Sequence, residues 1–531
     1  MKEKIRDKKF IFWCILAFAA VSRLIMLGRV PAGINQDEAM GAMDALALSK
    51  YGTDRFGMHL PVHFTAWGNS QMSVGLAYLM IPFIKALGFS AFSIRLPMAI
   101  VSIISVAVIY YISEKIFSDK RISLLIMFLT AVNPWHFIQS RWSIDCNLFP
   151  HVFLIAFLLL LIGLDKKPFL YISMVFFGLT FYCYGIAVYT VPVFLAVFAI
   201  WCLFKKQIKI SEVAISGIIF LIIALPEILV MIVNMLHLDT IETPFFTIPF
   251  FPESVRSNDI LFFNFSFSQL AKNALSMICS AFIQTPDYIF NTIPFFGPLY
   301  HISIPFMLIG IIVVFKRCFN KNEEIGIRTK YLALIGFLLS GIWVGLMTFE
   351  VNVNRINIIY YPLIIMTAVG IESVCAFFKD SKDKPVRMTI VGAYLIFATA
   401  FFICYGTYYR EEIKPWFGEN FIEAVRYADE MTNTDKLYIT SAMETQVNEK
   451  MSEILTQFAT ETDALYYQGK SDESNGRKRI SYSERYNYVD MTYVNFGNKG
   501  IYVMRNDETI GLPEYAELKY KNNAYSVILI D

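Results

Sequence analysis

Long apolar runs alternate with short polar segments along most of the chain. Runs of about 18 or more apolar residues with few charges are typical of helices that cross a bilayer. The runs predict about eleven membrane-spanning helices, near residues 10–28, 96–116, 122–139, 148–164, 169–185, 187–204, 212–235, 300–315, 331–348, 357–378 and 388–406. We therefore predict a polytopic α-helical membrane protein.

The pattern changes after residue 406. Apolar positions recur at helical spacing in Phe417–Met431 and 444–459, and short strand-like runs follow at Lys436–Thr440, Ile501–Arg505 and Tyr525–Ile530. This mixture of periods predicts a small α/β domain. We expect that domain to support the site or to recognise an acceptor, because it has neither a Gly-rich phosphate loop nor a nucleophile elbow.

The chain is therefore divided into a transmembrane domain and a soluble domain. The transmembrane domain covers residues 1–406, and its two long loops cover 29–95 and 236–299. The soluble α/β domain covers 407–531. The first loop includes an amphipathic stretch near 71–88, which we interpret as an interfacial helix rather than a span.

Basic residues concentrate in the loops of one side of the predicted membrane domain. Lys and Arg cluster in the N-terminal tail and in every second loop after it, whereas the short loops of the other side hold only Arg141 and Arg355. Such an asymmetry marks the cytoplasmic side. We therefore expect a cytoplasmic N-terminus and an extracytoplasmic C-terminal domain.

Composition excludes several other classes of protein. The chain is 56% hydrophobic and 17% charged, whereas soluble domains carry about 25% charged residues. Its net charge of +2 forms no basic stripe, so nucleic acid is not an expected partner. The 8 cysteines form no CxxC pair, so neither a disulfide framework nor a structural zinc site is predicted.

Paired carboxylates follow the first predicted span. Asp37 and Glu38 lie within the run Asn35-Gln36-Asp37-Glu38. One interpretation is a helix over 38–50 whose N-terminal dipole these acids complement. The other is a general base or a metal ligand that faces a substrate held at the membrane surface.

Two further polar groups lie at predicted outer turns. Arg141 and Asp145 are four residues apart, so on a helix they share one face and can form a local ion pair. Arg355 lies among apolar residues near the start of a late span. It either extends to the interface or binds an anion such as a lipid phosphate.

These features together resemble the GT-C superfamily of membrane glycosyltransferases. The resemblance rests on a basic tail and one span before Asp37-Glu38, on Arg-Leu-Pro at 95–97, on Ser-Arg-x-x-x-Asp at 140–145, and on the terminal α/β domain. It covers about residues 8–405 and is closest to bacterial relatives of protein O-mannosyltransferases and of the lipid A aminoarabinose transferase.

The resemblance implies a reaction and a set of site residues. Sugar would move from a polyprenyl-phosphate donor to an acceptor on the outer face, with inversion at the sugar carbon. Asp37 would be the catalytic base with Glu38 beside it, Arg141 and Asp145 would contact the substrate, and Arg355 would hold the lipid phosphate. Some relatives bind a divalent metal here and others do not, so no cofactor is predicted and a metal stays open.

The family likeness also implies location in a bacterial plasma membrane, surrounded by lipid. It leaves the sugar open, and the acceptor as a protein, a wall polymer or a glycolipid. The alternative function is a transporter or flippase of lipid-linked saccharides. A transporter should carry ionisable residues near the bilayer midplane, and Glu227, beside Pro226 in an apolar run, is the one feature that favours it.

Overall fold

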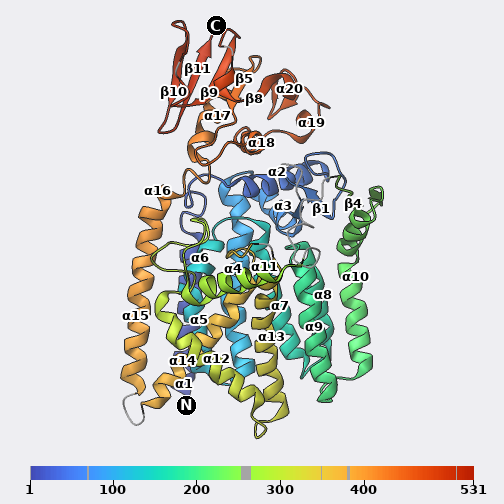
Figure 1. The fold of residues 1–531 in the computed structure, drawn as a ribbon, viewed down its shortest axis with the longest axis vertical. Coiled ribbons are helices and arrows are strands. Elements are labelled where there is room, and N and C mark those ends of the chain that lie inside the picture. Colours follow the sequence, from blue (N-terminus) through green and yellow to red (C-terminus); the bar gives the residue numbers. More distant parts are fainter. Residues whose placement is uncertain are drawn as a thin grey trace. The chain divides into compact units, whose positions relative to one another are not determined.

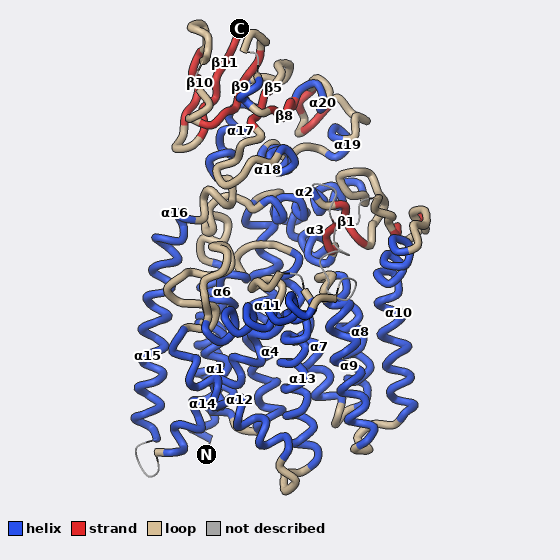
Figure 2. The backbone as a smooth tube through the Cα atoms, in the orientation of Figure 1, coloured by secondary structure: helices blue, strands red, loops and turns tan. Residues whose placement is uncertain are grey.

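Helices make up most of the chain in a computed structural model (Figure 2). The structure describes residues 2–67, 71–252, 265–348, 350–378, 383–494, 496–509 and 511–531, with side chains from Asp7 onward. Part of the predicted loop 236–299 therefore lies outside the described residues. The chain forms two compact units, which are described one at a time: residues 1–25, 98–229 and 255–406, and residues 26–97, 230–254 and 407–531.

Helices build most of the first unit (Figure 1). The helices of this part of the chain are α1 (Lys2–Leu24), α4 (Ala91–Phe117), α5 (Lys120–Val132), α6 (Pro134–Gln139), α7 (Asp145–Gly163), α8 (Lys167–Leu179), α9 (Ala187–Phe204), α10 (Ile210–Met235), α11 (Phe267–Met277), α12 (Ile304–Phe319), α13 (Ile325–Met347), α14 (Tyr360–Phe377) and α15 (Asp383–Cys404). Short turns of other helix types join them at η2 (Thr180–Tyr182), η4 (Ile278–Ile283), η5 (His301–Ser303), η6 (Asn357–Ile359) and η7 (Tyr405–Tyr409).

Within the described residues, 8 helices are long and apolar enough to cross a membrane. They cover, to within one residue, the predicted spans that begin near 96, 148, 187, 212, 300, 331, 357 and 388. The chain is thus a polytopic α-helical membrane protein, as predicted.

The other three predicted spans correspond to helices that fall short of a crossing by length or composition. α1 carries Lys8 and Lys9 near its start and Arg23 near its end. α5 and α8 have 13 residues each, or roughly 20 Å at 1.5 Å per residue, against a hydrocarbon core of about 30 Å. The count of about eleven therefore remains a prediction.

Close backbone contact joins α12 to α14. A Cβ atom added to Gly310 would lie 1.7 Å from the Met366 carbonyl oxygen, and one added to Gly370 would lie 1.8 Å from the Phe306 carbonyl oxygen. Small residues at such a crossing let two membrane helices approach closely enough for their backbones to pack. Glycine is therefore required at both positions.

The second unit combines the first long loop with the C-terminal residues. Its helices are α2 (Gln36–Tyr51), α3 (Gly75–Leu87), α16 (Arg410–Glu412), α17 (Glu419–Met431), α18 (Glu449–Ala459), α19 (Ala464–Tyr467), α20 (Tyr482–Arg485) and the 3-10 turn η8 (Met491–Tyr493). Three small hairpins pair β1 (His63–Thr65) with β2 (Gln71–Ser73), β3 (Ile241–Glu242) with β4 (Thr247–Ile248), and β6 (Glu473–Ser474) with β7 (Arg477–Lys478).

A mixed five-stranded sheet forms the centre of the C-terminal α/β region. Its strand order is β10-β11-β9-β5-β8, formed by β5 (Leu437–Thr440), β8 (Tyr486–Val489), β9 (Gly500–Arg505), β10 (Glu517–Lys521) and β11 (Tyr525–Ile530). β5 is parallel to β8 and β9, and β11 is antiparallel to β9 and β10. The predicted α/β character of this region is confirmed.

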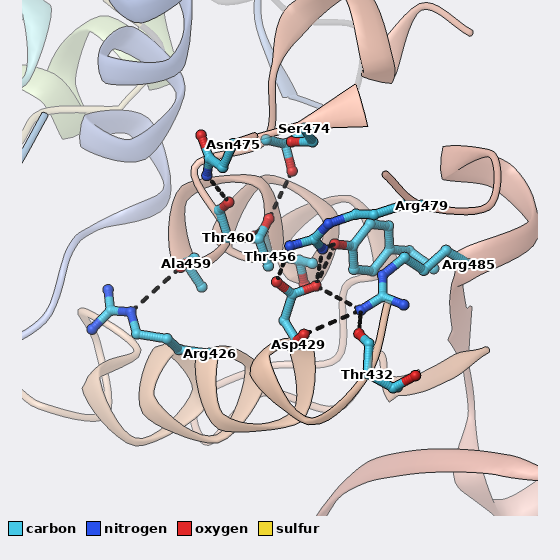
Figure 3. A network of polar contacts seen from close by, with 12 residues as sticks. Arg426, Asp429, Thr432, Thr456, Ala459, Thr460, Ser474, Asn475, Arg479 and Arg485 are labelled. Atoms are coloured by element: carbon cyan, nitrogen blue, oxygen red, sulfur yellow. Dashed lines mark hydrogen bonds and ion pairs between the residues drawn. The ribbon is translucent and has the colours of Figure 1, made fainter. Parts of the chain in front are cut away.

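A buried charge network closes the C-terminal end of α17 (Figure 3). Asp429 accepts hydrogen bonds from Arg479, Arg485 and the Tyr486 hydroxyl. Arg485 also donates to the Asp429 and Thr432 carbonyl oxygens. Burial alone would raise the pKa of Asp429, but these donors and charges outweigh it and hold that pKa below its ordinary value.

Candidate functional site

The start of α2 carries the predicted carboxylate pair. Asn35 is the N-cap, and its Oδ1 accepts a hydrogen bond from the Asp37 backbone N–H at 3.0 Å. Asn is a favoured N-cap residue, and acids in the first turn complement the positive end of the helix dipole. Asp37 and Glu38 are therefore held at fixed helical positions.

Glu38 is fully buried and bound by Arg95. Arg95 Nε and Nη2 each donate to one Glu38 carboxylate oxygen at 2.8 Å, and both side chains are 0% exposed. The same guanidinium donates to the carbonyl oxygens of Pro31 and Gly33, both at 2.8 Å. Arg95 thus connects the loop that precedes α2 to the first turn of that helix.

Asp37 is partly exposed, in contrast to its neighbour. The Trp67 indole N–H donates to Asp37 Oδ1 at 2.5 Å. An indole nitrogen is a donor only, so this contact suits the ionised carboxylate. Asp37 therefore combines a fixed backbone, an oriented side chain and access from outside.

A second buried ion pair supports the strand that leads to Trp67. Arg55 Nη1 donates to Asp44 Oδ2, and both residues are at most 4% exposed. Arg55 Nη2 donates to the Thr65 carbonyl oxygen at 2.9 Å. α2, which carries Asp37 and Asp44, is thus connected to β1 and to the residues that follow it.

Arg141 closes the C-terminal end of α1 within the first unit. Its guanidinium donates to the carbonyl oxygens of Ser22, Arg23 and Ile25 at 2.9–3.0 Å. Cationic side chains stabilise helix C-termini, where carbonyl groups lack partners. The residue is 2% exposed.

Asp145 begins α7 and is 5% exposed. The segment around it is bonded to the segment that carries Arg355. Gln139 Nε2 donates to Asn354 Oδ1 at 3.2 Å, and Asn357 Nδ2 donates to the Cys146 carbonyl oxygen at 2.7 Å. The structure therefore brings the two predicted outer turns together.

Arg355 lies in a loop that is bonded to two acidic residues, Glu350 and Asp287. Its Nη1 donates to the Glu350 carbonyl oxygen at 3.0 Å and lies 3.9 Å from the Glu350 carboxylate, and its side chain is 23% exposed. Asp287 accepts a hydrogen bond from the Val353 backbone N–H. Burial raises the pKa of Asp287, although this hydrogen bond by itself would lower that pKa.

The site residues thus fall into two groups. Asp37 and Glu38 belong to the second unit, and Arg141, Asp145 and Arg355 belong to the first; the structure describes each group by itself. Among the described residues, no set of three or more His, Cys, Asp or Glu is arranged to hold a metal ion. Both Glu38 oxygens are bound by Arg95, so this donor set does not favour a metal.

Trp67 is the residue of the site that sequence analysis misses. It lies 30 positions beyond Asp37, and no periodic pattern links the two. Arg95 could have been found, because an arginine at the start of an apolar run needs a partner. Which acid binds it does not follow from the sequence, since Asp44 and Asp54 lie nearer to Arg95 along the chain than Glu38 does.

A known family matches part of the sequence. Residues 73–230 match the family model described as dolichyl-phosphate-mannose-protein mannosyltransferase. No curated protein sequence matches the chain.

Solved structures of two other proteins share the fold. ArnT from Cupriavidus metallidurans bound to undecaprenyl phosphate is 11% identical, with a TM-score of 0.55 over 97% of each chain. The Archaeoglobus fulgidus oligosaccharyltransferase in complex with Zn and sulfate is 11% identical, with a TM-score of 0.50 over 83% of this chain and 61% of that one. At these identities the likeness concerns the fold.

Family match and fold agree with the motifs of the sequence. The matched family model is described as a mannosyltransferase, and the two similar structures are ArnT bound to undecaprenyl phosphate and an oligosaccharyltransferase. The chain is a multi-pass membrane protein with the fold of the GT-C superfamily, and it resembles the branch that holds the protein O-mannosyltransferases and ArnT.

Proposed function

We propose that this protein transfers a sugar from a polyprenyl-phosphate donor to an acceptor hydroxyl outside the cytoplasm. The observation that carries the proposal is the setting of Asp37. It is an accessible carboxylate on a rigid helix, oriented by an indole donor and flanked by a buried ion pair. General bases need such a fixed position within reach of the proton that they remove.

In the proposed reaction, Asp37 takes the proton of the acceptor hydroxyl as its oxygen attacks the anomeric carbon. The new carbon–oxygen bond forms as the bond from that carbon to the phosphate oxygen breaks, and polyprenyl phosphate leaves. The sugar carbon passes through an oxocarbenium-like state. A single attack from the opposite face inverts the configuration.

Glu38 acts through Asp37 in this proposal. Both of its carboxylate oxygens are bound by Arg95 inside a fully buried pair. A carboxylate in that position cannot reach an acceptor, but it fixes the first turn of α2. Glu38 is therefore a positioning residue and Asp37 the base.

Arg355 is the proposed phosphate ligand. Its side chain is partly exposed, and its partner Glu350 is 54% exposed at a distance of 3.9 Å. Exposed ion pairs of this kind contribute about 0–1 kcal/mol. A lipid phosphate can therefore replace Glu350 at little cost, and the arginine then stabilises the charge that develops on the leaving group.

Arg141 and Asp145 have settings that support positioning more than direct substrate contact. Arg141 is occupied by three carbonyl oxygens at the end of α1. Asp145 lies in the first turn of α7 and accepts a bond from the Cys146 N–H. We propose that both keep the outer turns of the first unit in place.

The proposed location is a bacterial plasma membrane, with the N-terminus in the cytoplasm and residues 407–531 outside. The basic loops of the sequence support this orientation. Proteins, wall polymers and glycolipids outside the membrane all carry hydroxyl groups that such an enzyme can use.

The proposal is tested by reconstituting the purified protein into liposomes. Polyprenyl-phosphate sugars, each radiolabelled in the sugar, are offered with a mixture of hydroxyl acceptors. The account predicts that label appears in an acceptor and that polyprenyl phosphate is released in equal amount. Label that only moves between leaflets, attached to its lipid, would instead establish a transporter, and Glu227 would then be the first residue to change.

A further inference from the structure

Contacts from the C-terminal residues reach both ends of the helix that carries Asp37. α2 begins at Gln36 and ends at Tyr51, and all of these contacts lie within the second unit. They come from segments roughly four hundred residues later in the chain, so they depend on the fold of residues 407–531.

At the beginning of α2, the chain is fixed by Phe417. The Ile34 backbone N–H donates to the Phe417 carbonyl oxygen at 2.7 Å. Gly33 has a φ of +77°, and a Cβ there would lie 2.3 Å from the same oxygen. Only glycine fits this turn, which sits directly before the N-cap of α2.

At its other end, α2 is fixed by Asp463. Lys50 Nζ lies 3.0 Å from Asp463 Oδ2, and the Tyr51 hydroxyl donates to the same carboxylate at 2.9 Å. Asp463 is 11% exposed and Lys50 38% exposed. The carboxylate is therefore held largely away from water, where such bonds are stronger than at an open surface.

Packing between these two ends adds apolar contact. α18 packs against α2 (Figure 1). Beside the helix, the Phe56 and Tyr467 rings lie 5.9 Å apart, and the Phe89 and Phe458 rings lie 5.3 Å apart. Gln468 Nε2 also donates to the Arg55 carbonyl oxygen at 3.0 Å.

We infer that residues 407–531 act as a clamp that positions Asp37, with Asp463 as the principal positioning residue at the far end of α2. This inference rests on the proposed function of Asp37 as the base. A rigid helix held at both ends cannot tilt or slide, so its first turn keeps one position. A displacement of about 1 Å at a reacting group can lower a rate by roughly a hundredfold.

The test removes the clamp from the α2 side, in the full-length protein. Asp463 also accepts a bond from the Leu465 N–H as the N-cap of α19, so Asp463→Ala disturbs its own domain. The double variant Lys50→Met/Tyr51→Phe keeps the side-chain volumes and leaves α19 intact. Asp472→Ala is the control, because it deletes an exposed ion pair with Lys478 in the same region.

Two quantities are measured: hydrogen exchange of the α2 amides, and the kinetic constants for sugar transfer. The inference predicts faster exchange at α2 in the double variant and kcat lower by roughly tenfold to a hundredfold, with KM for donor and acceptor unchanged. Asp463→Asn keeps one acceptor oxygen, for the Leu465 N–H and the Tyr51 hydroxyl, but loses the ion pair with Lys50, so its kcat should fall between those of wild type and the double variant. Asp472→Ala should match wild type in both quantities.

Other outcomes contradict the inference in separate ways. Unchanged α2 exchange in the double variant would overturn the clamp, whatever the transfer rate. An unchanged kcat with a raised acceptor KM would overturn it in favour of acceptor recognition by this region. Absence of transfer by wild-type protein would count against the proposed function instead, since α2 exchange decides the clamp without it.

Discussion

Three carboxylates on α2, those of Asp37, Glu38 and Asp44, are each held by a different kind of contact. Glu38 is neutralised by a fully buried guanidinium. Asp37 itself is oriented by an indole donor and stays accessible. Asp44 carries the second buried pair, which connects α2 to the strand before Trp67. Each contact limits the movement of the Asp37 side chain or of the helix that carries it.

Trp67 is expected to support catalysis through its N–H group. Trp67→Phe keeps an aromatic ring but removes the hydrogen bond to the ionised carboxylate, which makes protonation of Asp37 easier. We predict that the acidic limb of the kcat profile moves to higher pH and that kcat falls several-fold. Transfer rates between pH 4 and 9 measure both. A profile identical to that of wild type would show that the indole contributes only packing.

Arg95 is expected to be required for stability. Arg95→Met leaves the Glu38 carboxylate buried without its partner, and removing one member of a buried pair costs about 3–5 kcal/mol. Thermal unfolding in detergent should show a large loss for this variant and a smaller one for Glu38→Gln/Arg95→Met. Lys115→Met, which breaks an exposed pair with Asp165, is the control and should change stability by less than about 1 kcal/mol. Equal stability of Arg95→Met and wild type would contradict the burial of this pair.

At the residue scale, acids of the candidate site are easier to recognise in the sequence than the groups that bind them. Asp37 and Glu38 are adjacent, acidic and close to an apolar run, so their pattern is visible. The pairing of Glu38 with Arg95 spans 57 residues and forms only through the fold. The placement of Arg141 at the end of α1 is invisible for the same reason, because its partners are backbone carbonyl groups.

Helices and strands in this protein depend on packing as well as on local pattern. The mostly buried strands β5, β9 and β11 lie where the sequence predicts strands. β10, with the sequence ELKYK, is a mostly exposed edge strand, and β8 has only four residues. Neither has a pattern that distinguishes it from a loop, so both become visible only through their pairing in the sheet.

Because α12 and α14 cross closely, we expect one added methyl group at the crossing to lower the stability of the protein markedly. Gly370→Ala would place a Cβ against the Phe306 carbonyl oxygen, and overpacking of this kind costs about 1–3 kcal/mol. Gly217→Ala in α10 is the matched control, because nothing lies within 4 Å of its added Cβ. Unfolding temperatures in detergent compare the two. A Gly370→Ala variant as stable as Gly217→Ala would contradict the close crossing.

The charge network at the end of α17 is expected to make the local stability of that helix depend on pH. The folded-state pKa of Asp429 is lowered, so its stabilisation is present above the unfolded value of about 3.9 and is lost as the pH falls through the folded value. Protection of the α17 amides from hydrogen exchange should therefore be higher in wild type than in Asp429→Asn at pH 7. The difference should shrink below about pH 4. A difference that stays constant down to pH 3 would contradict the charged state of Asp429.

At the scale of the whole molecule, the apolar pattern predicts the class of fold, which is confirmed, and a count of about eleven crossings, which remains a prediction. Eight helices meet the requirements of a span among the described residues. α5 and α8 are short because Asn133-Pro134 and the turn after Leu179 end them. The contacts between the first long loop and residues 407–531 could not be predicted, since they join segments with no shared motif.

Asp37 is the residue on which the proposed sugar transfer depends most directly. Asp37→Asn keeps the shape and the helix N-terminus but removes the group that accepts the proton. A general base contributes roughly 10²–10⁴-fold to a rate. Asp239→Asn, at an exposed acid of the second long loop, is the matched control.

The measurement is single-turnover transfer from a saturating radiolabelled polyprenyl-phosphate sugar, with donor binding determined on the same preparations. The account predicts that Asp37→Asn binds the donor as wild type does and transfers sugar roughly 10²–10⁴-fold more slowly, while Asp239→Asn matches wild type. Transfer by Asp37→Asn at the wild-type rate would contradict the assignment of Asp37 as the base of the sugar transfer.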